Sequence, residues 1–161
     1  MNESIGGSAL TSLVVFILGA LLLILVGALS YSKAYRVKNR ILSIIDKYET
    51  FDNSANSEEL QEISSDLSSI GYSSVKIKDC NEIPTYKSLE AKKNNGTIKS
   101  FKIVYDGKNS YDYCVYEVNL DDGSYYYSVV TFLHINFPVI ESVAHVPVSG
   151  ETIIYSKKYD N

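Results

Sequence analysis

The chain opens with an almost uninterrupted run of apolar residues. From Ser4 to Ser32 there are 29 residues without a charged side chain, and Leu, Val, Ile and Phe dominate among them. As a helix, the segment Ala9–Tyr31 extends for roughly 34 Å, enough to cross a hydrocarbon core of roughly 30 Å. It lacks the polar stripe that a surface helix of a soluble domain carries. We therefore expect a short tail over 1–8 and a transmembrane helix over 9–31.

A cleaved secretory signal is the main alternative for this segment. Such signals carry a basic n-region and an apolar core of roughly 7–15 residues. Here the first seven residues, MNESIGG, contain neither Lys nor Arg, and the apolar run is longer than that core. The pattern favours a retained membrane span.

The apolar pattern changes period after the span and becomes amphipathic. Five residues recur at i, i+4, i+7, i+8 and i+11, the spacing of one helix face: Val37, Ile41, Ile44, Ile45 and Tyr48. No Pro or Gly interrupts the chain from Ala28 to Glu49. The sequence thus predicts one long helix over about 9–49, whose continuation over 32–49 faces a core.

A second helix is expected over 57–70. Asn56 or Ser57 can cap its first turn, a stripe of Leu and Ile supplies its buried side, and Gly71 can end it. The next residues, SSVKIK over 73–78, are typical of a short strand. The stretch 79–95 is polar and is expected to be irregular.

From about residue 98 the composition is that of β-strands. Four runs rich in Val, Ile, Tyr, Thr and Phe follow one another: 98–105, 112–120, 124–136 and 145–156. The turn Asp121-Asp122-Gly123 favours a hairpin, and Pro138 ends the third run. The predicted fold class is α+β: the long helix packed on an antiparallel β-meander of about four strands over 98–156, within a domain over 32–161.

Composition and charge exclude several classes of function. The chain has 161 residues, with 15 basic against 19 acidic side chains, which suits one domain with an appendage. Beyond residue 40 the acidic excess argues against nucleic acid binding. No Gly-rich phosphate loop and no GxSxG elbow occurs. We expect no catalytic site, no cofactor and no metal.

A basic cluster follows the apolar run directly: Lys33, Arg36, Lys38 and Arg40. Long cationic side chains at this place commonly anchor a helix to lipid headgroups. Taken alone, the positive-inside rule places the C-terminal domain in the cytoplasm. The two cysteines point the other way.

Cys80 and Cys114 are too far apart in sequence for a CxxC redox or zinc motif. A disulfide between them would close a loop of about 35 residues and would persist only in an oxidising compartment. The alternative is two unrelated thiols in a cytoplasmic domain. His134 and His145 lie on expected strands without ligand spacing, so they are interpreted as structural.

Two further features have open interpretations. Small residues at 19, 20, 27 and 28 (Gly19, Ala20, Gly27 and Ala28) would let another helix approach closely, or they reflect the ordinary composition of membrane helices. Tyr is abundant, at 14 residues, and clusters on the expected strands. These side chains would form either an exposed recognition surface or half-buried sheet positions.

The order of the expected elements along the chain resembles that of type IV pilins. Two passages carry the resemblance, GALLLILVGALSYSKAYRVKNRILSIIDKYE and TFLHINFPVIESVAHVPVSGETIIY. More narrowly, this order resembles that of the TadE-like minor pseudopilins of Gram-positive tight-adherence pilus systems. The resemblance implies a cytoplasmic N-terminus, an external domain and assembly through the N-terminal helix. Pilin precursors are usually cut after a Gly and carry Glu five residues on. Here Ser12 is fifth after Gly7, which favours a minor subunit.

The sequence thus leads to one principal expectation. We expect a non-enzymatic, single-pass protein of the cell membrane with an extracellular domain, acting as a minor pilin-like subunit in assembly of a surface pilus or a related secretion apparatus. Its partners would be the membrane and other pilin-like subunits or a secretion platform. The alternative is a membrane-anchored extracellular binding or sensory module with a Tyr-rich sheet surface.

Overall fold

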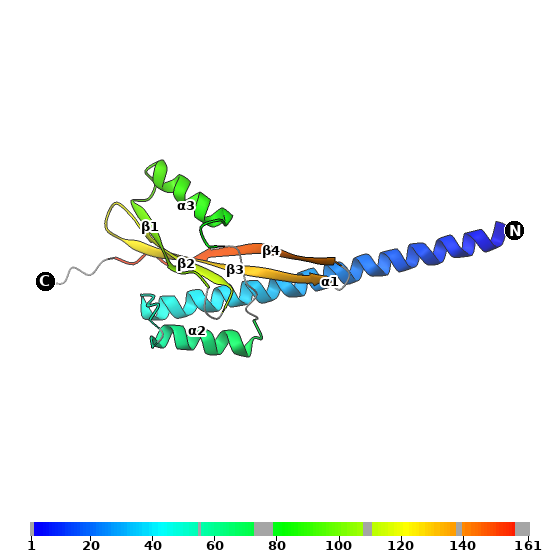
Figure 1. Ribbon diagram of the computed structural model, residues 1–161, viewed down its shortest axis with the longest axis horizontal. Helices are drawn as coiled ribbons and strands as arrows, with labels where there is room; N and C mark the ends of the chain where they lie inside the picture. The colour runs from blue at the N-terminus through cyan, green and yellow to red at the C-terminus, as the bar shows by residue number, and fades with distance from the viewer. Residues whose placement is uncertain (1, 55, 73–78, 108–110, 138–139, 157–161) are drawn as a thin grey trace.

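The computed structural model describes residues 2–54, 56–72, 79–107, 111–137 and 140–156, with 2–7 and 133–145 described by their backbone alone. Three helices and four strands follow one another: α1 (Asn2–Tyr48), α2 (Glu58–Ser69), α3 (Pro84–Asn94), β1 (Ser100–Tyr105), β2 (Tyr113–Asn119), β3 (Tyr125–Phe137) and β4 (Ile140–Glu151). Figure 1 shows α1 as a rod whose second half carries the rest of the molecule. The predicted α+β class is confirmed.

The predicted long helix is a single α-helix, α1, without a break between its two halves. It begins at Asn2 rather than at Ala9, so residues 2–8 of the predicted tail are helical. It ends before Glu49, whose φ of 54° turns the chain out of the helix. The amphipathic stripe faces the core as expected, since Val37, Ile41, Ile44 and Ile45 are buried.

The four strands form one antiparallel sheet in the order β1-β2-β3-β4. The hairpin at Asp121–Gly123 is present, and Gly123 adopts a φ of 84° that favours glycine. The fourth strand differs from its expected range. It starts at Ile140 because β4 pairs with β3 as far as Phe137, and it stops at Glu151, after which Tyr155 meets Tyr125 in an isolated bridge.

The sheet is covered on both faces, which gives three layers (Figure 1). On one face, α1 and α2 pack against inward residues of β2 and β3 such as Tyr113, Val115 and Val129. On the other, α3 and its flanking segments pack against Cys114, Tyr116 and neighbouring residues. Successive strand residues point to opposite faces. The central strands therefore contribute alternately to two cores, and nearly all residues of β2 and of β3 as far as Phe132 are buried.

Helix α3 was not expected, because the stretch 79–95 reads as polar and irregular. Pro84 stands at the start of the helix, where a missing backbone N–H costs nothing. Only Leu89 among its residues is buried, so an apolar stripe gives little signal. Helix α2 matches its prediction: Ser57 Oγ accepts a hydrogen bond from the Leu60 N–H at 3.2 Å. The predicted strand 73–78 lies outside the described residues.

Candidate membrane and assembly interface

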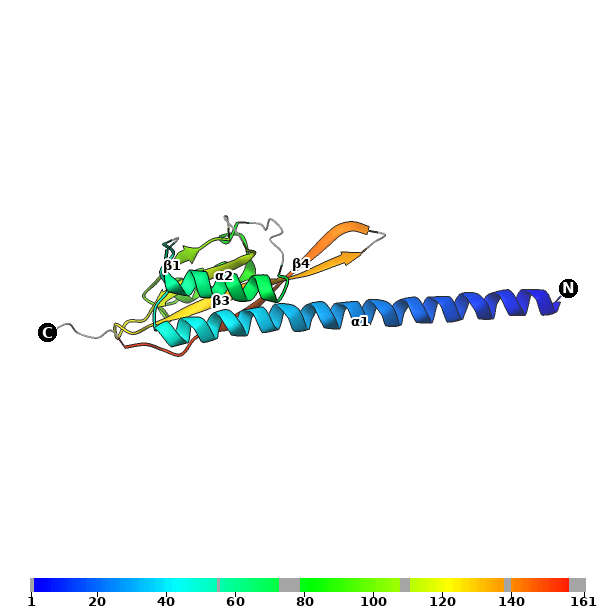
Figure 2. The same ribbon diagram turned by 90° about the horizontal axis from the view of Figure 1, so that it is seen from below.

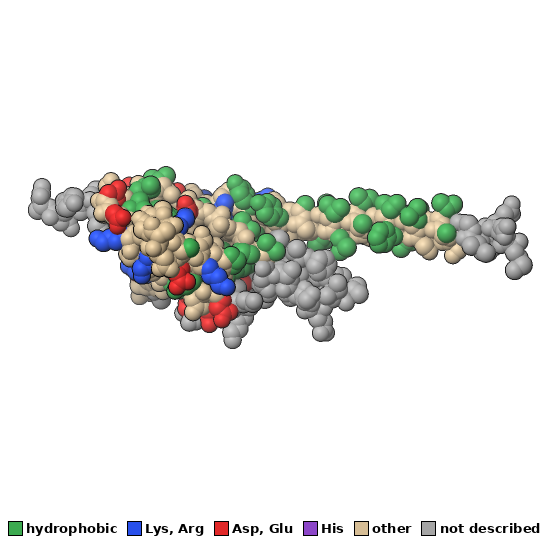
Figure 3. Space-filling view, turned by 90° about the horizontal axis from the view of Figure 1, so that it is seen from above, with side chains coloured by type: hydrophobic (Ala, Val, Ile, Leu, Met, Phe, Trp, Pro, Cys, Tyr) green, Lys and Arg blue, Asp and Glu red, His purple; other side chains and the backbone are tan. Residues whose placement is uncertain are grey.

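The first half of α1 exposes apolar side chains on all sides. Among residues 8–33 none is buried, and Phe16 and Ile24 are 75% and 69% exposed. Figure 3 shows these side chains along a rod without visible charge, whereas charged groups gather on the domain. A core helix of a soluble protein would be largely buried, but none of the most apolar window of this helix is. By length and composition it is a candidate membrane span.

Aromatic residues mark the end of the exposed apolar run. Tyr31 and Tyr35 lie one turn apart, stack with ring centroids 6.3 Å apart, and are 53% and 46% exposed. Tyrosines are enriched where membrane helices leave the hydrocarbon, because their rings are apolar and their hydroxyls are wet. Sequence reasoning missed this pair. The pair could have been recognised from the sequence, because two aromatic residues stand four positions apart directly after the apolar run.

The basic cluster contacts the domain more than the sequence suggested. Lys33 Nζ donates to the Gly71 carbonyl oxygen, and the Arg40 guanidinium pairs with the Asp66 carboxylate. The hydrogen bond to Asp66 raises the pKa of Arg40 above its ordinary value. These two bonds fasten α2 to α1. Both residues nevertheless remain exposed, so the expected headgroup contacts stay a prediction.

The other two members of the basic cluster differ in exposure. Lys38 is only 8% exposed, and its ammonium lies 4.2 Å from the centroid of the Tyr35 ring, a cation–π contact. Its aliphatic stem passes beside Gly150 of β4. Arg36 is exposed.

The four small residues of the membrane segment do not form one narrow face. At about 100° per residue, Gly19, Ala20 and Gly27 fall within about 100° of one another. They lie on the side of α1 that Ala34 and Val37 continue into the domain core. Ala28 lies outside this arc. A Cβ added at Gly19 or Gly27 would meet no atom within 4 Å, so space for a neighbouring helix is open there.

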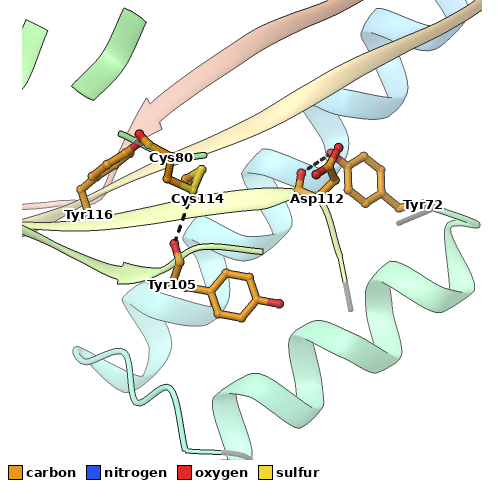
Figure 4. Close-up of a disulfide and its surroundings, with 6 residues drawn as sticks. All are labelled: Tyr72, Cys80, Tyr105, Asp112, Cys114 and Tyr116. Atoms are coloured by element: carbon orange, nitrogen blue, oxygen red, sulfur yellow. Dashed lines mark hydrogen bonds between the residues drawn. A yellow bond between two sulfur atoms is a disulfide. The ribbon is translucent and has the colours of Figure 1, made fainter. Parts of the chain in front are cut away.

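The two cysteines form a disulfide, as expected. Cys80 and Cys114 have Cα atoms 6.0 Å apart, and both residues are buried. Figure 4 shows the bridge between the segment before α3 and strand β2. The Tyr116 hydroxyl donates to the Cys80 carbonyl oxygen at 2.6 Å, and burial raises the pKa of this phenol, which keeps it a neutral donor. The disulfide thus holds the α3 layer to the sheet.

A second buried tyrosine, Tyr72, links the end of helix α2 to the sheet from its other side (Figure 4). Tyr72, directly after α2, donates to the Asp112 carbonyl oxygen at 2.8 Å. The Phe132 N–H donates to the Tyr72 hydroxyl at 3.0 Å. Burial raises the pKa of Tyr72, as it does that of Tyr116. These bonds tie α2 to β3 and to the start of β2.

The Tyr-rich sheet is a core and not an exposed recognition surface. Tyr residues at seven strand or strand-adjacent positions are buried or half-buried: Tyr111, Tyr113, Tyr116, Tyr125, Tyr126, Tyr127 and Tyr155. Several stack on one another, for example Tyr105 and Tyr113 with centroids 4.3 Å apart. Of the two interpretations of the tyrosines, the structure shows the half-buried sheet.

Polar hollows are shallow in the part of the chain that the structure describes. One of about 330 Å³ lies beside the disulfide and is lined by Asn53, Asp79, Asn81 and Asp106 among others. No group of three His, Cys, Asp or Glu residues that suits a metal ion occurs among the described residues. His134 and His145 are cross-strand partners of β3 and β4.

Comparisons with known proteins supply no relative. No family model, no curated protein and no solved structure matches the chain. Its function must therefore be argued from the geometry above.

Proposed function

We propose that this protein is a non-enzymatic, single-pass membrane subunit of pilin-like type, which acts in assembling a surface pilus or a related secretion apparatus. One observation carries the proposal: a single unbroken helix is exposed and apolar in its first half and forms the core of the domain in its second. Such a helix couples the domain rigidly to the membrane segment. A subunit held in this way can pack against its neighbours through the segment while presenting the domain outside.

The disulfide supports an external domain within this proposal. Disulfides persist in oxidising compartments and are rare in the cytosol. The basic cluster argues less strongly for a cytoplasmic domain than its sequence suggests, because Lys33 and Arg40 bond to α2 and Lys38 is buried. Arg36, which is exposed, makes no such contact to α2 in the described part of the chain, whereas Lys33 and Arg40 are exposed but bonded.

Assembly through α1 is tested by disulfide cross-linking in membranes. Single cysteines replace Ala20 or Gly27 on the small-residue side, with Leu22→Cys and Leu29→Cys on the opposite side as matched controls. The native cysteines are buried and already bridged, so they do not compete. Oxidation should give covalent dimers at A20C and G27C and few at the control positions. Absence of dimers at every position would contradict assembly through this helix.

A further inference from the structure

A shallow groove runs between α1 and α2. Its volume is about 390 Å³, and its lining includes Arg36, Asn39, Arg40 and Ser43 from α1 and Asp66 and Ser69 from α2. The four residues of α1 recur at i, i+3, i+4 and i+7, so they form one stripe along the helix. Figure 2 shows α2 lying alongside the second half of α1. The groove therefore belongs to the part of α1 that carries the domain.

The two helices that form the groove run antiparallel. Three bonds follow one another along the pair: Lys47 to Glu62, Arg40 to Asp66, and Lys33 to the Gly71 carbonyl oxygen. The last turn of α2 thus lies beside the place where α1 leaves its apolar run. Arg36 of α1 and Ile70 of α2 line the groove at this end. One end of the groove is therefore directed toward the candidate membrane span.

Arg36 stands at the level of the lipid headgroups. It follows Tyr31, the last residue of the expected span, by five residues, which is about 7.5 Å along the helix axis. The headgroup layer on each side of a bilayer is about 5–7 Å thick. A long Arg side chain can also reach back toward the membrane from its own level. The guanidinium is thus within reach of a headgroup phosphate.

This end of the groove has an excess of positive charge. The carboxylate in the lining is that of Asp66, and the Arg40 guanidinium pairs with it. Arg36 is exposed, and among the described residues no acidic side chain forms an ion pair with it. Lys33 donates to a neutral carbonyl oxygen, which leaves its charge uncompensated. Two cations therefore stand where α1 leaves the membrane, beside a carboxylate that is already paired.

The side chains at this end suit a phosphodiester. A guanidinium presents a planar fork of N–H groups that fits two phosphate oxygens at once. Asn39, which is exposed one turn further along the same stripe, carries two more amide donors. Ile70 is half-buried and adds an apolar wall next to these donors. Donors beside an apolar wall match a phosphate that is esterified to an apolar lipid body.

We propose that the membrane end of this groove binds the phosphodiester headgroup of an anionic phospholipid, with the Arg36 guanidinium on the phosphate oxygens. A zwitterionic headgroup is disfavoured, because it would bring its own cation toward Lys33 and Arg36. The acyl chains of the bound lipid continue past Ser32, which lies one turn before Arg36 on the same stripe. The inference rests on the membrane anchoring of the proposed function and not on assembly.

Nitroxide quenching of a fluorophore beside the site tests the inference. The full chain is placed as single copies in phosphatidylcholine nanodiscs with a small fraction of phosphatidylglycerol that carries a nitroxide on its upper acyl chain. The matched sample holds the same fraction of nitroxide-labelled phosphatidylcholine. The fluorophore is attached at Ser32→Cys, on the groove side of α1. Ser30→Cys, about 200° away around the helix at nearly the same level, is the control position.

Labelled phosphatidylglycerol should quench the Ser32→Cys label about fivefold more than labelled phosphatidylcholine, the factor that one cation near a membrane surface supplies. At Ser30→Cys the two lipids should quench equally. Arg36→Gln should abolish the preference at position 32, and Arg36→Lys should lose most of it because an ammonium cannot form the fork. Lys93→Gln, which removes one exposed charge from α3, should leave the preference unchanged. Unchanged thermal unfolding in detergent shows that each variant keeps its fold.

Equal quenching by the two lipids at position 32 would overturn the site. A third label, at Leu22→Cys within the span, separates the two failures: if it is quenched, the anchor stands, and if it is not, the anchor falls as well. A preference that Arg36→Lys retains in full would show attraction to charge in general and would also overturn the site.

A soluble phosphodiester is the other source of the same chemistry. Glycerophosphoglycerol, the headgroup of phosphatidylglycerol without its acyl chains, is added at the total concentration of the labelled lipid. It should not reduce the quenching at Ser32→Cys, because the lipid is held at the surface by its chains and so has the higher effective concentration. Displacement at that concentration would assign the groove to a soluble ligand and overturn the lipid contact.

Discussion

The Thr131 hydroxyl donates a hydrogen bond to the Ala34 carbonyl oxygen at 3.0 Å, across 97 residues of sequence. The bond joins the central part of the sheet to the long helix at the point where the apolar run ends. It fixes how far along α1 the domain sits. Both residues are buried, so water does not compete for the bond.

Replacing Thr131 by Val should lower the free energy of unfolding by about 1 kcal/mol, the usual net value of one neutral hydrogen bond. Val has nearly the shape of Thr, so the change removes the donor and little volume. Thr131→Ser keeps the hydroxyl and is the matched control for the bond. Denaturant unfolding of the full chain in detergent micelles measures both. A Val variant as stable as the native chain would show that the bond does not position the domain.

Gly150→Ala should also destabilise the contact between β4 and α1. A Cβ there would lie 2.9 Å from Leu42 Cδ1 and 2.9 Å from Lys38 Cδ. Because Lys38 is buried, its stem has little room to move, and overpacking of this kind costs about 1–3 kcal/mol. The exposed neighbour Ser149 provides the control, Ser149→Ala, which should be neutral. Equal unfolding midpoints for the two variants would contradict the close packing.

Removing the disulfide should cost more than either change. Cys80 and Cys114 are 34 residues apart, and a bridge of that span contributes about 3–4 kcal/mol through the unfolded chain. We expect the double variant Cys80→Ala/Cys114→Ala to lose about that much, measured by denaturant unfolding. Asn81→Ala, next to the bridge and exposed, is the control. Retention of full stability in the double variant would mean that the disulfide does not constrain the fold.

Acid should weaken the attachment of α2 to α1. Lys47 Nζ donates to Glu62 Oε2 at 2.8 Å, and this bond holds the pKa of Glu62 below its ordinary value of 4.5. A carboxyl with a depressed folded-state pKa stabilises the fold above its unfolded pKa and loses this contribution as pH falls through the folded value. The difference in Tm between the native chain and Glu62→Gln should therefore shrink as the pH falls below about 4.5. A Tm difference that stays constant as the pH falls would show that the Lys47–Glu62 pair does not stabilise the fold.

Much of the fold could be predicted from local pattern. Three predicted features depend only on residues close together in sequence, and all three are present: the apolar stripe Val37–Tyr48, the cap at Ser57 and the turn at Gly123. Helix α3 was not predicted, because its one buried residue, Leu89, gives no repeating pattern of apolar positions. Its position depends on the disulfide and on packing against the sheet, which only the tertiary structure supplies.

The candidate interface was predicted less completely than the fold. The exposed apolar half of α1 follows directly from composition. The partners of Lys33 and Arg40 do not, because Asp66 lies on α2 and Gly71 follows it, 26 and 38 residues away in sequence. The position of the sheet along α1 was also not predictable. It depends on one long-range bond from Thr131 to Ala34, which a local pattern does not encode.

The central claim is that α1 crosses the membrane and holds the disulfide-bonded domain outside. Because Cys80 and Cys114 are buried, labelling them would report on unfolding rather than on location, so introduced cysteines are needed. The most direct measurement is labelling of Asp121→Cys and Ser8→Cys in intact cells with a membrane-impermeant thiol reagent. The account predicts labelling at position 121 in intact cells and at position 8 only after the cells are opened. Labelling of position 121 only after lysis would place the domain inside and contradict the account.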